Sequence, residues 1–426
     1  MTLPRPAEPP AVSGPRPRVR RPRPAIARGI AAALAALFVV AAIAGGVYGL
    51  RGRPRVSDAN ITAGVVETIS ALRTQWDPRL FVLEVTPTAS GGGVMLAGAV
   101  DGANASELLA AVREVQGVRR VVDRLVRLPD PALGPETVAL VVVAVANLGD
   151  APSRAQGDHL VTQARLGDAL EVLREQDGWY LVRMTDDGYL GWVDAAGVVR
   201  LTPAVLEAYL AGAYVLVTAK LADVFEAEGG QVRLRAVMGS ALKAGQGPGP
   251  AGSGDGSGLD PAYLAVTLPD GRPGLVRDTE ARLLPSALAV WAQTRPPAEI
   301  IALAEQFLGL PYLWGGTTSQ GFDCSGFVQF VFGLNGYRLP RDADMQYGVG
   351  TPIADRSALL PGDLVFWSTA GVGPSHVGIY VGGLRYIHSR GSAGVAINSF
   401  DPGAPGYDEG LDRAYIGARR LVEGAP

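Results

Sequence analysis

Two kinds of hydrophobic pattern follow each other in the N-terminal part of the chain. Residues 29–50 form an apolar run of 22 residues without a charge, which is long enough to cross a bilayer as one helix. In 61–75 and 106–115, apolar side chains recur every three or four residues, as on one face of a helix. The stretches FVLEV, GGGVMLAGAV and VRRVVDRLVRL predict strands around these helices. We therefore expect a small α/β unit over 56–130.

Short alternating strands dominate the next part of the chain. In 137–200 they are separated by the turn signals LGD, QDG and DDG, as in a small antiparallel barrel. Residues 213–285 repeat the same order of strands, and 201–210 predict a linking helix. A Gly-rich insertion at 245–260 interrupts this second copy and predicts a flexible loop.

The last part, 298–422, mixes helices and strands. AEIIALAEQFLG has helical spacing, and Asp323 is a suitable N-cap for a helix over SGFVQFVFGL. HVGIYVG and LRYIHS predict two strands joined at a turn by Gly382 and Gly383. The whole chain is thus expected to be an α+β multidomain protein with one transmembrane helix ahead of its folded parts.

Composition and charge narrow the class of protein. A chain of 426 residues is too long for one compact domain. Its net charge of −3 argues against a nucleic-acid partner.

Residues 1–28 are basic and rich in Pro, and they are expected to be disordered. More arginines precede the apolar run than follow it, which predicts a single-pass protein of the cell membrane with a cytoplasmic N-terminus and an extracytoplasmic remainder. A cleaved signal peptide is the alternative.

The single cysteine is the first candidate for chemistry. Cys324 lies in the first turn of the predicted helix, where backbone amides and the helix dipole favour a thiolate, the nucleophilic form of cysteine. Of three histidines, His376 and His388 are expected near each other across the predicted strand pair. His376 could then accept the thiol proton, and His388 could orient the first imidazole.

Other interpretations of these residues stay open at this stage. Cys324 could be an inert buried side chain, or it could bind zinc together with the two histidines. The same fold could host an amidase or an acyltransferase. In a protein of another class, the N-terminal modules would bind the cell envelope and the last domain would not be catalytic.

The motifs LGLPYLWGG, FDCSGFVQ, LPRDADMQ, LLPGDLVFW and SHVGIYVGG with YIHS come in one order over 298–422. The segment resembles the NlpC/P60 cysteine peptidases, a papain-like group. The resemblance implies that Cys324 is the nucleophile, His376 the base and His388 the third member of a triad. It further implies that Tyr312 stabilises the oxyanion and that Asp342 contacts substrate. The expected reaction is hydrolysis of the γ-D-glutamyl–diamino acid bond in peptidoglycan stem peptides, without a metal or organic cofactor.

Two weaker resemblances cover the modules before this domain. VMLAGAV and VQGVRRVVDRL make 56–130 similar to a BON domain, while DGWYLVRM and DGYLGWV make 137–200 similar to an SH3b domain, with 213–285 as a degenerate copy. In relatives, an acid before "L-V-x-Q" and a Tyr in "DGY-x-GWV" bind the free amine of a terminal L-Ala. Tyr189 matches the Tyr, whereas His159 stands at the acid's position with Asp158 one residue earlier. We therefore expect substrate contacts from Tyr189 and Asp158 and a weakened preference for a free amine.

Overall fold

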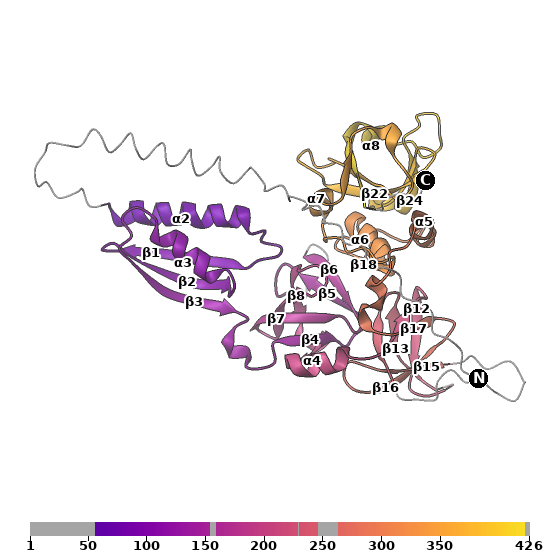
Figure 1. The fold of residues 1–426 in the computed structure, drawn as a ribbon, viewed down its shortest axis with the longest axis horizontal. Helices are drawn as coiled ribbons and strands as arrows, with labels where there is room; N and C mark the ends of the chain where they lie inside the picture. The colour runs from indigo at the N-terminus through magenta and orange to yellow at the C-terminus, as the bar shows by residue number, and fades with distance from the viewer. Residues whose placement is uncertain (1–55, 154–158, 229, 246–262, 422–426) are drawn as a thin grey trace, which may run out of the picture. The chain divides into compact units, whose positions relative to one another are not determined.

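The computed structural model describes residues 56–153, 159–228, 230–245 and 263–421 (Figure 1). The predicted segments 1–28 and 29–50 lie outside these residues, as do Asp158 and nearly all of the Gly-rich insertion. Among the helices that the structure describes, none has both the length and the hydrophobicity needed to span a membrane.

The first folded unit is a three-stranded sheet with two helices packed on one face (Figure 1). β1 and β2 are antiparallel, and β3 lies parallel to β2 after a crossover through α3. Ile61 and Val65 of α2 are buried against Leu96 of β2, so the helical stripe in the sequence faces the sheet. The elements are α2 Asp58–Gln75, β1 Leu83–Ser90, β2 Gly93–Asp101, α3 Ala105–Arg113 and β3 Arg120–Leu128.

Two seven-stranded antiparallel sheets follow in the chain. A turn through Asp177 and Gly178, both at positive φ, joins β7 to β8, which is the hairpin that an Asp-Gly pair favours. The helix α4, Pro203–Leu210, links the sheets. The first sheet holds β4 Val138–Val141, β5 Val145–Gly149, β6 Leu160–Arg165, β7 Ala169–Gln176, β8 Trp179–Met184, β9 Leu190–Asp194 and β10 Val198–Leu201. The second holds β11 Tyr214–Val217, β12 Leu221–Phe225, β13 Val232–Val237, β14 Ala241–Ala244, β15 Tyr263–Thr267, β16 Pro273–Arg277 and β17 Ala281–Leu284.

The C-terminal domain packs helix α6 on an antiparallel sheet of order β20-β25-β21-β22-β23-β24. Phe327 and Val331 of α6 are buried in the same core as Val377 and Ile387 of the sheet. The elements are α5 Pro297–Glu305, β18 Thr317–Thr318, β19 Gly321–Phe322, α6 Cys324–Leu334, α7 Ala343–Tyr347, β20 Thr351–Ile353, β21 Leu364–Trp367, β22 His376–Gly382, β23 Arg385–Arg390, β24 Gly394–Ser399, α8 Glu409–Ala414 and β25 Tyr415–Arg420.

Candidate active site

Cys324 is the first residue of helix α6. Asp323 caps the helix, because its carboxylate accepts a 2.6 Å hydrogen bond from the Gly326 N–H. Position 326 needs glycine, since a Cβ atom there would lie 2.2 Å from the carbonyl oxygen of Gly316. The close approach of this loop leaves Cys324 only 9% exposed. The predicted position of the thiol, in the first turn of a capped helix, is confirmed.

His376 and His388 meet across strands β22 and β23, as the sequence predicts. His376 Nε2 lies 2.7 Å from His388 Nδ1, and His388 Nε2 lies 3.0 Å from Oδ1 of Asn398 on β24. The indole of Trp367 packs beside both imidazoles, with its centroid 5.3 Å from that of His376 and 6.0 Å from that of His388. The side chains therefore form one ordered hydrogen-bonded chain behind the first histidine.

The hydrogen-bond partners fix the proton positions in this chain. Asn398 Nδ2 donates to the Gly406 carbonyl at 2.7 Å, so Asn398 Oδ1 is the acceptor that faces His388. His388 Nε2 must then carry a proton, and in the neutral ring its Nδ1 accepts from His376 Nε2–H. The remaining nitrogen, His376 Nδ1, is left with a free lone pair. A neutral His376 is thereby prepared to act as a base.

Burial keeps both partners of the expected proton transfer neutral. It raises the pKa of the Cys324 thiol to about 12, and the nearby Asp323 carboxylate adds to this effect. The backbone amide of Val377 acts in the opposite direction but does not overcome burial. This outcome differs from the expectation of a thiolate: the helix N-terminus is present, but desolvation of the charge outweighs it here.

The two histidines are shifted the other way by the same cause. Burial holds the pKa of His376 well below its usual value, and its neighbour His388 contributes to the shift. Burial also lowers the pKa of His388 to about 4, although the Asn398 hydrogen bond favours its charged form. At neutral pH the Cys324 thiol and both imidazoles are therefore uncharged.

Tyr312 lies near the thiol, as the sequence motif implies. It is half-buried and bridges to Phe322, the strand residue two positions before Cys324. Burial raises the pKa of Tyr312, and the proximity of Cys324 is the next cause. Its hydroxyl therefore keeps its proton at neutral pH and can donate a hydrogen bond next to the nucleophile.

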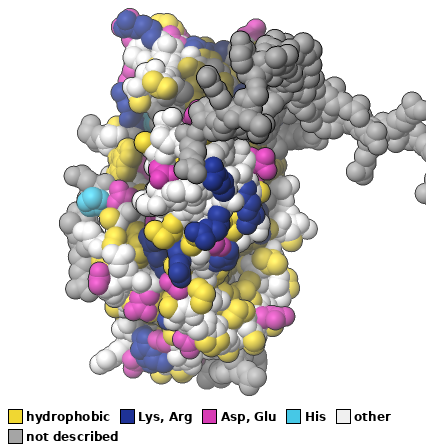
Figure 2. All heavy atoms as spheres, turned by 90° about the vertical axis from the view of Figure 1, so that its left-hand side faces the viewer, with side chains coloured by type: hydrophobic (Ala, Val, Ile, Leu, Met, Phe, Trp, Pro, Cys, Tyr) yellow, Lys and Arg dark blue, Asp and Glu magenta, His cyan; other side chains and the backbone are white. Residues whose placement is uncertain are grey.

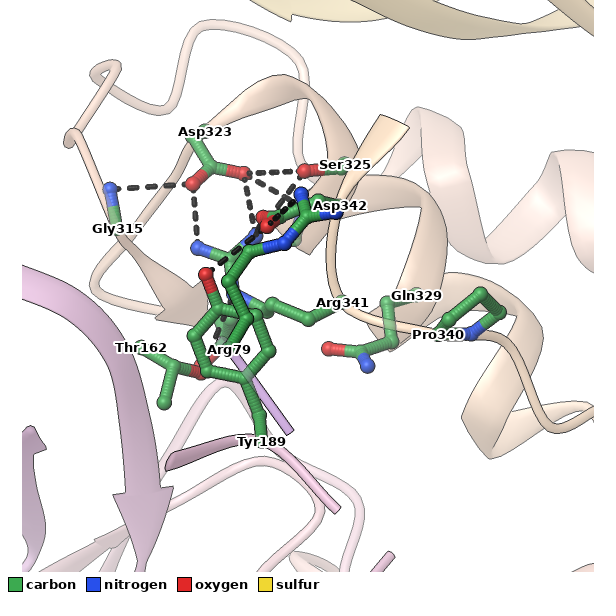
Figure 3. A network of polar contacts seen from close by, with 12 residues as sticks. Arg79, Thr162, Tyr189, Gly315, Asp323, Ser325, Gln329, Pro340, Arg341 and Asp342 are labelled. Atoms are coloured by element: carbon green, nitrogen blue, oxygen red, sulfur yellow. Dashed lines mark hydrogen bonds and ion pairs between the residues drawn. The ribbon is translucent and has the colours of Figure 1, made fainter. Parts of the chain in front are cut away.

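Asp323 also belongs to an ionic network (Figure 3). Arg341 is 1% exposed, and its Nη2 lies 2.5 Å from Asp323 Oδ2. Its Nη1 donates to Ser325 Oγ at 3.0 Å, and its Nε donates to Thr162 Oγ1 at 3.2 Å. Arg341 thus compensates the buried cap of the nucleophile helix and ties that helix to strand β6 of the first seven-stranded sheet.

Asp342 and Tyr189, both predicted to bind substrate, contact each other. The Tyr189 hydroxyl donates to Asp342 Oδ2 at 2.9 Å. The same oxygen accepts a 2.8 Å hydrogen bond from Arg79 of the first folded unit (Figure 3). The structure therefore places the predicted pair together at the ionic side of the site, with a third residue already bound to it.

His159 lies apart from this pair. Its side chain is 47% exposed, and its Nδ1 is 2.8 Å from Asp150 Oδ1. The strand after it does contact the C-terminal domain, because Gln163 Oε1 accepts hydrogen bonds from the Thr317 N–H and the Thr318 hydroxyl. The predicted role of Asp158 remains untested, since this residue is not described.

Three residues of the site were not predicted from the sequence. Asn398 had a detectable signal, because it is a polar residue in the strand GVAINS that follows the strand of His388. Arg341 directly precedes Asp342, but a solvated turn explained its charge equally well. Arg79 offered no local signal, since its partner Asp342 is 263 positions away.

Profiles of two known domains match the parts of the chain that contain these residues. The profile of the NlpC/P60 family matches residues 309–407, and that of the bacterial dipeptidyl-peptidase Sh3 domain matches residues 150–198. The first match contains Cys324, His376, His388 and Asn398, and the second contains Tyr189.

The chain is similar to two curated dipeptidyl-peptidases. A gamma-D-glutamyl-L-lysine dipeptidyl-peptidase of Bacillus subtilis is 48% identical over 107 residues, which cover 24% of this chain and 35% of that protein. One of the same name from Bacillus cereus is 36% identical over 166 residues, which cover 38% of this chain and 47% of that protein. The chain thus spans less than half the length of either relative.

A crystal structure of an NlpC/P60 family protein from Bacillus cereus shares the fold. It superimposes with a TM-score of 0.56 at 24% identity and covers 66% of this chain and 99% of that one. The chain thus contains an NlpC/P60 domain over residues 309–407, and a bacterial dipeptidyl-peptidase Sh3 domain over residues 150–198 precedes it.

Proposed function

We propose that this protein is a cysteine peptidase that hydrolyses amide bonds in peptidoglycan stem peptides. One observation carries the proposal. Cys324 begins helix α6, which packs against β22, and the first residue of β22 is His376. His376 is in turn hydrogen-bonded to His388, and His388 to Asn398. The names of the two dipeptidyl-peptidase relatives favour the bond between γ-D-glutamate and the following diamino acid.

In the proposed reaction, the neutral thiol loses its proton as it attacks. Cys324 Sγ adds to the substrate carbonyl while its proton moves to His376 Nδ1, and the carbonyl oxygen takes up the negative charge. The Tyr312 hydroxyl and the Cys324 backbone N–H would donate to that oxygen. His376 then returns the proton to the leaving amine, which leaves a thioester. Attack by water, with His376 again as the base, releases the acid and restores the thiol.

His388 and Asn398 act as positioning residues in this scheme. Because His388 Nδ1 accepts from His376 Nε2–H, the basic lone pair of His376 stays on Nδ1 throughout the cycle. The hydrogen bond would also stabilise the imidazolium that forms during attack, as the third residue does in other triads.

Substrate contacts are assigned to the ionic side of the site. Asp342 and Tyr189 lie together there, next to the residues that hold Cys324 in place. Asp158 is retained as a proposed contact on the sequence match alone. The first SH3-type domain would thus close one end of the cleft, and strand β6 would fix its position through Gln163.

The location at the membrane is also proposed from the sequence. The apolar run 29–50 with its basic lead favours an anchor that leaves the catalytic domain outside the cytoplasm. The BON-like unit would serve as an envelope-binding module. In support, Figure 2 shows Lys and Arg side chains gathered on one face of the molecule, and the unit exposes Arg119, Arg120, Arg124 and Arg127. Such a surface suits anionic polymers or headgroups.

Digestion of a purified stem tetrapeptide tests the function. Mass spectrometry of the products should show cleavage after γ-D-glutamate with the wild-type protein. Cys324→Ala should give none while melting at the wild-type temperature. Products that form at the wild-type rate in Cys324→Ala, or that vanish with a chelator and return with zinc, would refute the cysteine mechanism.

A further inference from the structure

A loop of the N-terminal α/β unit reaches the substrate side of the candidate active site. The loop follows α2 and is anchored on the first seven-stranded sheet (β4 to β10), which we call the first SH3-type sheet. Leu190 N–H donates to the Arg79 carbonyl at 2.8 Å, and Arg183 donates to the Leu80 carbonyl at 3.3 Å. The Leu80 side chain packs against the core that contains Tyr189. Backbone hydrogen bonds and core packing therefore fix the position of Arg79, which does not depend on one surface contact.

The Arg79 guanidinium binds carboxylates of the C-terminal domain. Its Nη1 is 2.8 Å from Asp342 Oδ2, and its Nη2 is 2.8 Å from Asp344 Oδ2. Asp77 of the same loop completes the arrangement at 2.7 Å. A planar guanidinium is suited to bridging several carboxylates in this way, which a single ammonium cannot do with the same geometry.

Without Arg79, the same groups would form a site for a cation. Asp342 would present a carboxylate whose orientation is fixed by the Tyr189 hydroxyl at 2.9 Å. Arg341, the neighbour of Asp342, is committed to Asp323, the residue before Cys324. An ammonium bound to Asp342 would therefore belong to a molecule that extends toward the nucleophile, and the cations of the proposed stem-peptide substrate are primary ammonium groups.

We propose that Arg79 is an internal occupant of this cation site and that it determines specificity by competing with the N-terminal ammonium group of a peptide. The inference rests on the proposed function and deepens it. The wild-type protein accordingly accepts peptides whose amine is blocked, including stems still attached to glycan.

The test compares peptides that differ only in the amine. The full-length protein is assayed with a stem tetrapeptide, with the same peptide N-acetylated, and with a version in which only the side-chain amine of the diamino acid is blocked. Arg79→Ala should raise kcat/KM for the free peptide about tenfold, the size of one charge-assisted hydrogen bond. The value for the N-acetylated peptide should change by less than about threefold, so the preference should appear only where the N-terminal amine is free. A gain that follows the side-chain amine would assign the site to the diamino acid instead and overturn the terminal-amine assignment.

Matched variants separate the cation site from general loosening of the domains. Arg174→Ala removes a different ion pair of the same α/β unit, the one that joins Glu84 to the first SH3-type sheet, and should leave the ratio of the two rates unchanged. Asp342→Asn placed on Arg79→Ala should abolish the gain. Equal changes for both peptides in Arg79→Ala, or the same change in Arg174→Ala, would overturn the proposal.

A binding experiment keeps the inference testable if no hydrolysis is found. Calorimetry of L-Ala-γ-D-Glu and its N-acetyl form with Cys324→Ala protein needs no catalysis. The free dipeptide should bind about tenfold more tightly when Arg79→Ala is added, and the acetylated one should not. Absence of cleavage together with this shift would refute the proposed function alone, whereas cleavage without the shift would refute the role of Arg79 alone.

Discussion

Two polar regions lie next to Cys324, and they differ in how their buried polar groups are stabilised. On one side, His376, His388 and Asn398 form a chain of neutral hydrogen bonds. On the other side, Asp323 and Arg341 form a buried ion pair. The neutral chain has a lone pair that can accept a proton, whereas each ion of a buried pair depends on its partner. The first region is thus suited to chemistry and the second to holding the nucleophile in place.

Loss of the base should give the largest effect and should fall on activity. His376→Ala removes the only lone pair assigned to the thiol proton, so we expect kcat/KM to fall by roughly 10²–10⁴. His388→Ala should cost less, because water can partly replace a positioning group. His388→Gln keeps an acceptor for His376 Nε2–H and serves as the folded control. A loss in His388→Gln as large as in His376→Ala would contradict the assignment of roles.

Loss of the cation on the other side should fall mainly on stability. Arg341→Met leaves the Asp323 carboxylate buried without its partner, which costs on the order of 3–5 kcal/mol. The double variant Asp323→Asn, Arg341→Met removes both charges but keeps a side chain that can cap α6, so it should recover part of this loss. Thermal melting of the full chain measures both. A wild-type melting temperature for Arg341→Met would contradict the assignment of the Asp323–Arg341 pair to stability.

The neutral side should control the pH dependence. The pKa of His388 is lowered to about 4 by burial and that of His376 is also lowered, so activity should persist below pH 6.5. Between pH 6.5 and 4 the unfolded chain binds protons that the folded histidines do not. The free energy of unfolding should therefore decrease as the pH is lowered through this range. Asn398→Asp places a carboxylate beside His388, raises its pKa, and should move the acid limb of kcat/KM to higher pH. An unchanged limb would show that this chain does not govern the titration.

The smallest expected effect concerns the tie between the domains. Thr162→Val removes the acceptor for Arg341 Nε while keeping the shape of the side chain, and it should cost about 1–3 kcal/mol. Thr162→Ser keeps a hydroxyl and should be close to wild type. If both variants melt alike, the Thr162 hydrogen bond contributes nothing and the ionic region ends at Ser325.

The parts of the site that the sequence predicted are those encoded locally. The cap at Asp323 and the helix after it follow from a few adjacent residues, and the turn at Gly382 fixes the pairing that brings His376 to His388. Such features depend on backbone conformation within one or two elements, which side-chain pattern and turn residues specify.

The parts that the sequence did not predict depend on packing between distant elements. The raised pKa of Cys324 reflects how completely the fold covers the thiol, and no local pattern reports that burial. Arg79 reaches Asp342 only because Leu80 packs on the first SH3-type sheet. Asn398 is intermediate, since its strand could be predicted but the face it presents depends on the register with β23.

Cys324 is the sole cysteine of the chain, and this has a redox consequence. If an oxidant converts it to a sulfenic acid, the protein contains no second thiol that could displace the oxygen and form an internal disulfide. Recovery then depends on a small thiol from outside that can reach Cys324. The same burial that keeps the sulfur protonated slows its oxidation, because thiolates react far faster than thiols. The nucleophile proposed here would thus be protected by its burial and not by a second thiol within the chain.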